Sequence, residues 1–424
     1  MGRILIAASP IPGHVMPLLR VGGDLCARGH DVTVLTGGEY RRAVSEDRLQ
    51  LVALPQGARP RRASARDHWA PPLLSRWRLG RADMVSVFIA PLAAQFYALR
   101  DVLRANHFDM VLCDIAFTGV LPILLGGNPR PAVFACGVGP LTLSSTDVPP
   151  FGMGWAPKVG RDYRAMTRVV HEGLMGDVQR RLNQTLAALD APRSPAFLTD
   201  WPVLADRLLQ FTIPAMEYPR SDLPAHVTFT GPVVAQTLRP AKQAPRCNAR
   251  HVVHVTQGTW DNHDLDELLT PTLDGLAGCN DMHVVATTGN RGDVGLSRQL
   301  PSNAVVTDFV SYSALLPTVD VMVTNGGYGG VHHALLHGIP LVVAGATADK
   351  PEIAARVAYA GAGVNLGVKR PTPAAVAHAV QHVLRTPRYR QMARALGEDM
   401  RRYNAFGLIA DAVSGVASTH AVPE

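Results

Sequence analysis

The chain has 424 residues, of which 47% are hydrophobic and 18% are charged, and this length suits two hydrophobic cores better than one. The formal net charge is +7, but the arginines are spread widely and no nucleic-acid motif is present, so we expect no nucleic-acid partner. The five cysteines are scattered and odd in number, which argues against a disulfide framework or a zinc site.

The chain opens with a buried-strand pattern at residues 3–8, a loop rich in proline, a helical pattern from 18 to 26 and a second strand at 31–36. This order predicts the start of a doubly wound parallel sheet. Pro10 and Pro12 interrupt the first apolar stretch, and no apolar run reaches the length of a membrane span. We therefore expect a cytoplasmic protein, either free or in peripheral contact with the inner face of the plasma membrane.

The rest of the first half continues to alternate between helices and strands. The expected elements are a helix at 84–103, a strand at 110–113, a helix at 118–125, a strand at 132–136, a helical stretch at 161–189 and strands at 208–213 and 227–230. Residues 137–160 are dense in Gly, Pro and Ser, so we expect an irregular segment that lines a cleft. Residues 231–250 have the composition of an interdomain linker.

The second half repeats the same pattern. Its expected elements are strands at 252–256, 282–287, 305–309 and 319–324, a helix at 265–276, and amphipathic helices after Pro373. The predicted fold is α/β, with two doubly wound Rossmann-like domains facing each other across a cleft. The predicted boundaries are 1–235 for an acceptor-binding domain, 236–404 for a nucleotide-sugar-binding domain, and 405–424 for a last helix that packs back on the first domain. We leave open whether the protein is a monomer or a homodimer.

A glycine-rich turn follows the strand at 319–324. Gly326, Gly327, Gly329 and Gly330 lack a Cβ, so a ligand can approach the backbone, and the next helix points its first N–H groups at that ligand. A diphosphate would suit this arrangement. Close packing of a strand-to-helix turn would produce the same residues, so this pattern alone leaves both interpretations open.

Three motifs, in this order, resemble glycosyltransferase family 1, the two-domain GT-B enzymes that include plant and bacterial natural-product glycosyltransferases. Gly13-His14-Val15-Met16-Pro17 is similar to the G-H-x-x-P motif of that family, Asp114 follows the strand at 110–113, and the block 309–366 contains the remaining motifs. The resemblance implies an inverting transfer of a hexose from a UDP- or dTDP-sugar to a hydroxyl of a hydrophobic small molecule or lipid. The nucleotide sugar is a co-substrate, and no cofactor is expected.

The same resemblance assigns roles to single residues. It implies that His14 is the general base and that Asp114 holds the second ring nitrogen of His14. It places Phe309 on the pyrimidine base, Val310 at the edge of that base, and Asp349 and Lys350 at the sugar hydroxyls. The full set expected to bind the nucleotide sugar is Gly13, Gln257, Gly258, Thr259, Phe309, Val310, Asn325, Gly326, Gly327, Gly329, Gly330, His333, Asp349 and Lys350.

Three of these residues depart from the family pattern. Asn325 stands where the family usually has a histidine, His333 replaces the glutamate that binds both ribose hydroxyls, and Lys350 replaces a glutamine. Neither His333 nor Lys350 carries a carboxylate or carboxamide oxygen that could accept hydrogen bonds from hydroxyl groups. We therefore expect weaker selection for ribose, from the change at 333, and a donor sugar other than glucose, from the change at 350. A dTDP-6-deoxyhexose, with dTDP-rhamnose as the first choice, is the resulting hypothesis, and UDP-glucose is the alternative.

Asp264-Leu265-Asp266 spells the Asp-x-Asp of metal-dependent glycosyltransferases. The same residues open a predicted helix, where acidic side chains cap free N–H groups, and we therefore predict no metal. Two other functions remain open on this fold. One is a nucleotide-sugar epimerase or hydrolase, and the other is a non-catalytic nucleotide-sugar-binding partner protein.

Overall fold

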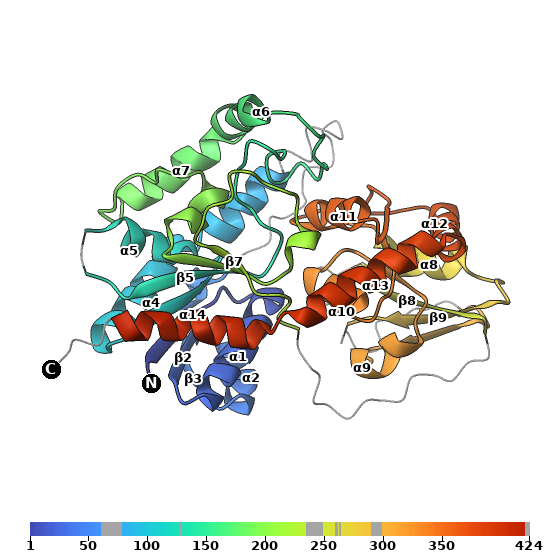
Figure 1. The fold of residues 1–424 in the computed structure, drawn as a ribbon, viewed down its shortest axis with the longest axis horizontal. Coiled ribbons are helices and arrows are strands. Elements are labelled where there is room, and N and C mark those ends of the chain that lie inside the picture. The colour runs from blue at the N-terminus through green and yellow to red at the C-terminus, as the bar shows by residue number, and fades with distance from the viewer. Residues whose placement is uncertain are drawn as a thin grey trace.

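The computed structural model describes residues 1–60, 79–127, 129–234, 249–258, 262, 264–289 and 299–419. Two parallel sheets form its frame, each covered by helices on both faces (Figure 1). The predicted boundary between residues 235 and 236 lies outside the described residues. The two-domain α/β prediction is confirmed in the arrangement of the sheets.

The first sheet has seven strands in the order β3-β2-β1-β4-β5-β6-β7. Its strands are β1 (Arg3–Ala7), β2 (Asp31–Thr36), β3 (Gln50–Ala53), β4 (Met110–Asp114), β5 (Ala132–Gly137), β6 (Arg207–Gln210) and β7 (Val227–Phe229). Its α-helices are α1 (Pro12–Ala27), α2 (Arg41–Glu46), α4 (Leu92–Ala105), α5 (Leu121–Leu125), α6 (Arg164–Arg168) and α7 (Gly176–Ala187), with π-helical turns η3 (Val85–Ile89) and η5 (Val169–Leu174). Short 3₁₀ turns are η1 (Gly38–Tyr40), η2 (Gln56–Ala58), η4 (Thr118–Val120), η6 (Leu198–Leu204) and η7 (Pro214–Met216).

The second sheet has six strands in the order β10-β9-β8-β11-β12-β13. These are β8 (His251–Thr256), β9 (Met282–Thr287), β10 (Ala304–Thr307), β11 (Val321–Thr324), β12 (Leu341–Val343) and β13 (Gly363–Asn365). The helices of this half are α8 (Leu269–Gly275), α9 (Tyr312–Leu315), α10 (Tyr328–Leu336), α11 (Lys350–Tyr359), α12 (Pro373–Arg385) and α13 (Pro387–Arg402), with 3₁₀ turns η8 (Leu265–Glu267) and η9 (Leu316–Thr318).

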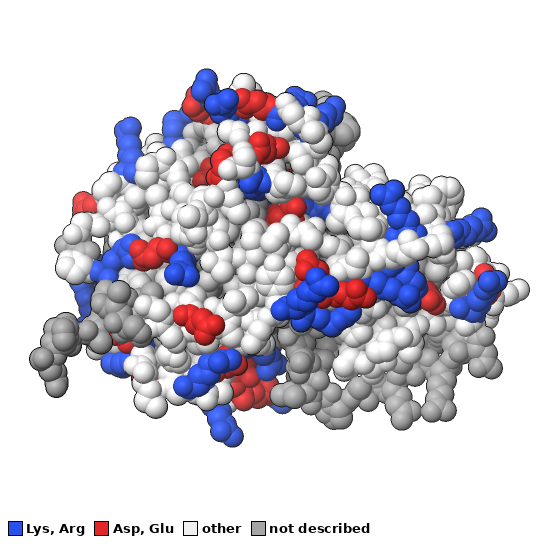
Figure 2. All heavy atoms as spheres, viewed as in Figure 1, with Lys and Arg blue, Asp and Glu red and all other residues white. Residues whose placement is uncertain are grey.

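Each sheet is buried on both faces, as its continuous apolar strands predicted. Along β1, Leu5 and Ala7 enter one hydrophobic core of the first half, whereas Ile4 and Ile6 enter the core on the opposite face. The second half likewise has one core on each side of its sheet. On the face drawn in Figure 2, basic and acidic side chains are intermingled rather than gathered by sign.

The strand orders create one switch point in each half. In the first sheet the order reverses between β1 and β4, and in the second it reverses between β8 and β11. Crevices at such points lie outside the carboxyl ends of the strands and are where ligands bind in doubly wound sheets. Asp114 is the last residue of β4, and His14 lies in the first turn of α1, after the loop that follows β1. Gln257 and Asn325 directly follow β8 and β11.

One helical stretch differs from the expectation. Within the described residues, 79–105 form one helical segment that is long and apolar enough, by length and composition alone, to cross a membrane. We had expected no such segment. Leu92 and Leu99 on α4 are fully buried in the first core, so this part of the stretch packs inside the first half.

The chain passes between the halves a second time near its end. Helix α14 (Ala405–Thr419) leaves the second half after α13 and lies across the first half beside α1 (Figure 1). Ile409 and Val413 of α14 are buried in a first-half core. The two crossing segments touch, because a Cβ at Gly231 (φ +83°) would collide with the side chain of Tyr403.

Candidate active site

The switch point of the first half brings together an imidazole and a carboxylate. Pro12 opens α1 and its ring is compatible with the first helical turn, so His14 sits in that turn directly after the β1 loop. His14 Nδ1 lies 2.6 Å from Asp114 Oδ1. The second oxygen of Asp114 accepts a hydrogen bond of 3.2 Å from the backbone N–H of Ser9. Asp114 is fully buried, whereas the side chain of His14 keeps 24% of its surface exposed.

This pairing decides the protonation of His14. Burial by itself lowers the pKa of His14, but the Asp114 carboxylate and its hydrogen bond outweigh burial, and the net pKa is raised above 6.5. With Asp114 on Nδ1, the Nε2 atom is left to exchange a proton. The arrangement can therefore accept a proton from a hydroxyl and hold the resulting imidazolium beside a carboxylate.

Asp349 approaches this pair from the second half. It is the N-cap residue of α11, yet its carboxylate makes no capping hydrogen bond. A Cβ added at Gly139 of the first half would lie 3.5 Å from Asp349 Oδ2, so the carboxylate lies at the junction of the two halves. Burial raises the pKa of Asp349, while Lys350 and His14 oppose that shift. The Asp349 carboxylate thus raises the pKa of His14, and His14 in turn opposes the rise in the pKa of Asp349.

The glycine turn of the second half leaves open space. Gly326 adopts φ +90°, and a Cβ there would lie 3.1 Å from Val343 Cγ1, so packing and backbone both require glycine at this position. A Cβ at Gly329, by contrast, would meet no atom of the described residues within 4 Å outside the backbone of its own helix, and the same holds for Gly13 in the opposite half. Close packing therefore explains the glycine at 326, whereas Gly329 is exposed and packing does not require a glycine there.

The helix that follows the turn begins without a side-chain cap. Gly327 is the N-cap residue of α10, and within the described part of the chain no side-chain capping hydrogen bond is present at this helix start. Unsatisfied N–H groups and the positive end of the helix dipole form a site for anionic oxygen atoms.

The two residues expected at the pyrimidine base lie just beyond β10. This strand ends at Thr307 rather than at the predicted residue 309. Phe309 has 38% of its surface exposed, whereas Val310 is buried.

Comparisons with known proteins agree with this geometry. Residues 271–405 match the family described as erythromycin biosynthesis protein CIII-like, C-terminal domain. The chain is 35% identical to 4'-demethylrebeccamycin synthase of Lentzea aerocolonigenes, over 97% of this chain and 98% of that protein. The chain belongs to glycosyltransferase family 1. It is also 34% identical to UDP-glycosyltransferase 2 of Phaeomoniella chlamydospora, over 98% of this chain and 96% of the relative.

The solved structures show the fold. The glycosyltransferase of kitacinnamycin superposes with a TM-score of 0.75 at 23% identity, over 98% of both chains. CalG4, the calicheamicin glycosyltransferase, superposes with a TM-score of 0.72 over the full length of both chains. The predictions of family, GT-B fold and glycosyltransferase activity are therefore confirmed, and this family 1 enzyme uses nucleotide sugars.

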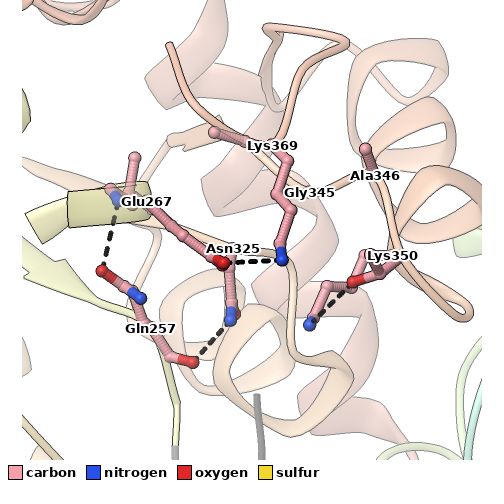
Figure 3. Close-up of a pocket in the computed structure, with 10 residues that line it drawn as sticks. Gln257, Glu267, Asn325, Gly345, Ala346, Lys350 and Lys369 are labelled. Carbon is pink, nitrogen blue, oxygen red and sulfur yellow. Dashed lines mark hydrogen bonds and ion pairs between the residues drawn. The ribbon is translucent and has the colours of Figure 1, made fainter. Parts of the chain in front are cut away.

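His333 and Lys350, two of the residues that depart from the family 1 pattern, are both largely buried but have different neighbours. The His333 ring lies edge-on to Tyr312 with centroids 5.1 Å apart, and burial lowers the pKa of His333 to about 4, so the ring is neutral near pH 7. Lys350 is 8% exposed, and its Nζ lies 3.5 Å from Thr347 Oγ1. It enters a small pocket (Figure 3) lined by Gln257, Glu267, Leu268, Asn325, Ala344, Gly345, Ala346, Thr347 and Lys369.

The side chain of Gln257 is engaged within the second half. Its side-chain oxygen accepts hydrogen bonds from the backbone N–H groups of Leu268 and Leu269, and its amide donates to the Asp264 carbonyl. Its backbone oxygen accepts from the Asn325 amide. The Gln257 side chain therefore holds the start of α8, and Gly258 in the same turn has φ +72°. That Gln257 and Gly258 bind the nucleotide sugar stays a prediction. Thr259 lies outside the described residues.

Asp264 acts as a cap in this family 1 chain. Its Oδ1 accepts from the N–H of Asp266 at 3.0 Å, which opens the turn η8, and its Oδ2 pairs with Arg370. No group of three or more His, Cys, Asp or Glu with metal-binding geometry occurs among the described residues. These contacts match the capping interpretation of the Asp-x-Asp sequence.

Ser9 and Gln95 support the pair formed by His14 and Asp114, and neither residue was predicted. The Gln95 amide donates to Ser9 Oγ at 3.2 Å, and Gln95 Oε1 accepts from the N–H of Gly119 at 3.1 Å. Gln95 is fully buried on α4, so it fixes the loop that carries Ser9. The signal in the sequence that could have revealed Gln95 was a glutamine within the largely apolar helix predicted at 84–103, because a polar side chain that becomes buried needs hydrogen-bond partners.

Proposed function

We propose that this enzyme moves a hexose, with inversion and without a metal, from a dTDP- or UDP-sugar to a hydroxyl of a hydrophobic acceptor. The observation that carries the proposal is the 2.6 Å contact between His14 and the buried Asp114, next to Asp349 of the other half. The reaction is general-base catalysis with displacement at one carbon.

In this reaction His14 Nε2 takes the proton of the acceptor hydroxyl as the oxygen attacks the anomeric carbon. The bond from that carbon to the diphosphate breaks, and the electron pair leaves with the nucleoside diphosphate. The open N–H groups at the start of α10 stabilise the developing charge on the leaving diphosphate. The proton remains on the imidazole, where the Asp114 carboxylate stabilises it. A single in-line displacement inverts the configuration.

For the donor we propose a dTDP-6-deoxyhexose, with dTDP-rhamnose as the first choice. Neutral His333 cannot replace the two oxygens of a carboxylate, which supports a donor that lacks one ribose hydroxyl. The second candidate is UDP-glucose, which the name of a 32% identical relative favours, UDP-glucosyltransferase 1 of Beauveria bassiana. For the acceptor we propose a hydrophobic secondary metabolite or glycolipid precursor, and we propose that the enzyme works in the cytoplasm or at the inner face of the plasma membrane.

The donor is tested by competition binding and turnover with dTDP-rhamnose, dTDP-glucose, UDP-rhamnose and UDP-glucose. His333→Glu should shift the preference toward UDP by about 1 to 2 kcal/mol, the scale of one regained hydrogen-bonded pair. If the wild-type enzyme prefers UDP-glucose over dTDP-sugars by more than tenfold, dTDP-rhamnose is ruled out as the preferred donor and UDP-glucose takes its place.

The reaction class is tested with the same donors and a panel of hydrophobic acceptors. Release of nucleoside diphosphate should depend on the acceptor, and NMR of the product should show an inverted anomeric centre. Release without an acceptor would favour the hydrolase or epimerase, and donor binding without any product would favour the non-catalytic partner.

A further inference from the structure

A guanidinium with almost no exposure lies between the two halves. The side chain of Arg356, on α11, is 2% exposed. Its Nε is 2.7 Å from Glu217 Oε2 in the first half, and its Nη1 is 2.7 Å from Glu352 Oε2 one turn earlier on α11. The three side chains therefore form a buried ion triad across the junction.

The second oxygen of each carboxylate binds the irregular segment 137–160 of the first half. Glu217 Oε1 accepts from the N–H of Leu141 at 2.8 Å. Glu352 Oε1 accepts from the N–H groups of Gly152 and Gly154, at 2.9 and 2.7 Å. The segment that we expected to line the cleft is thus held at two places by the triad.

Two packing contacts fix the guanidinium and the start of its helix. The Arg356 guanidinium lies 4.5 Å above the ring of Tyr218. At the beginning of α11, a Cβ at Gly154 (φ +65°) would lie 2.8 Å from Pro351 Cβ, so the loop and the helix start are in direct contact. The contacts extend over the turns of α11 from Pro351 to Arg356.

A buried ion triad of this kind contributes little net stability. Removing charges from water costs several kcal/mol per ion, and hydrophobic side chains of similar volume often stabilise a protein as well or better. What a buried and fully hydrogen-bonded triad provides is one defined geometry. Because Asp349 directly precedes α11, that geometry also sets where the Asp349 carboxylate lies relative to His14.

We propose that Arg356, Glu217 and Glu352 are positioning residues, which dock α11 on the acceptor half and thereby hold Asp349 opposite His14. This inference rests on the proposed function in one respect, which is that His14 acts as the base. It assigns to the triad an effect on the reaction that a purely structural ion pair would not have.

The test is Glu217→Gln, which removes one charge and leaves the pair of Arg356 with Glu352. The charged groups that act on His14 are Asp114 from β4 and Asp349 from the α11 start, and both raise the pKa of His14. If Asp349 moves away, the titration midpoint of the His14 ring should fall by roughly 0.5 to 1 pH unit, the lower end of the effect of one nearby charge. We expect Asp349→Asn, which removes that charge directly, to cause a similar fall. In Glu217→Gln, kcat should also drop about tenfold because the reacting groups are misplaced.

The matched control is Asp206→Asn. Asp206 also pairs with an arginine, Arg130, at 2.7 Å and also accepts a backbone N–H, from Val133, but it lies away from the junction and is partly exposed. This variant should leave the His14 midpoint and kcat unchanged. Glu352→Gln serves as a second junction variant if Glu217→Gln unfolds.

The midpoint is measured by NMR of the His14 ring, identified with His14→Gln, so this readout does not depend on activity. An unchanged midpoint and a kcat within threefold of wild type in a folded Glu217→Gln or Glu352→Gln variant would overturn the inference. Failure of the proposed function would give a different result. The His14→Gln enzyme would stay active, while Glu217→Gln and Glu352→Gln would still shift the titration midpoint of the His14 ring.

Discussion

His14 and Asp114 are one hundred positions apart in the chain, and their contact depends on the adjacency of β1 and β4. Asp114 ends β4, and His14 lies in the helical turn after the loop that follows β1, and both strands were recognisable in the sequence. Once both strands are placed in one parallel sheet, their carboxyl ends must meet at one edge. This is why the candidate base and its partner could be predicted from short motifs.

His14→Ala should keep the donor affinity and lower kcat by about two to four orders of magnitude, the usual contribution of general acid–base catalysis. The wild-type activity should fall in acid as the pH drops through the raised pKa of His14, because only the neutral ring accepts a proton. His107→Ala, at a side chain that is 80% exposed, is the control and should change neither quantity. A His14→Ala enzyme with a kcat within a few-fold of wild type would remove His14 from this role.

At the scale of elements, what the sequence predicted well was the order of buried strands. Runs of β-branched and apolar residues such as those of β8 and β11 are typical of parallel strands that are buried on both faces. The hydrogen bonds from the Leu268 and Leu269 N–H groups to the Gln257 side chain could not be predicted, because they depend on local three-dimensional geometry that no spacing rule encodes. The contact of Arg356 with Glu217, 139 positions away, depends on how two separate halves dock.

The capped turn η8 allows a test of the metal prediction. We expect activity to survive EDTA, because the start of α10 can stabilise the leaving diphosphate and Asp264 is engaged with Asp266 and Arg370. Asp264→Ala should lower the stability by about 1 kcal/mol through loss of the cap, with kcat within a few-fold of wild type, and Asp264→Asn should restore the stability. Activity that is abolished by chelation and restored by manganese or magnesium would contradict this prediction.

For the whole molecule, two buried histidines link the fold to pH. His254 Nδ1 donates a hydrogen bond to the Val285 carbonyl at 2.9 Å, and burial lowers the pKa of His254 to about 4. His332 contacts Thr212 of the other half at 3.0 Å, and burial lowers the pKa of His332 to about 3. Below pH 6.5 the unfolded chain binds protons at both positions while the folded protein does not, so stability must fall as the pH is lowered.

Between pH 6.5 and 4, each of these histidines should remove about 1.4 kcal/mol of unfolding free energy per pH unit. Urea unfolding at pH 7, 6 and 5 measures this slope. His254→Gln should flatten the slope by about one histidine's share, whereas the exposed His378→Gln should leave it unchanged. An identical slope in wild type and His254→Gln would show that His254 is protonated in the folded state.

The position of α14 has a consequence for biosynthesis. Ile409 and Val413 belong to a first-half core, but the ribosome adds them only after it has made every strand of the second half. Helices α12 and α13, which complete the second half, emerge before α14 does. The second half can therefore finish folding before the first half does. Until α14 has been synthesised, the apolar surface of the first half that α14 covers stays exposed, and chaperones can bind it.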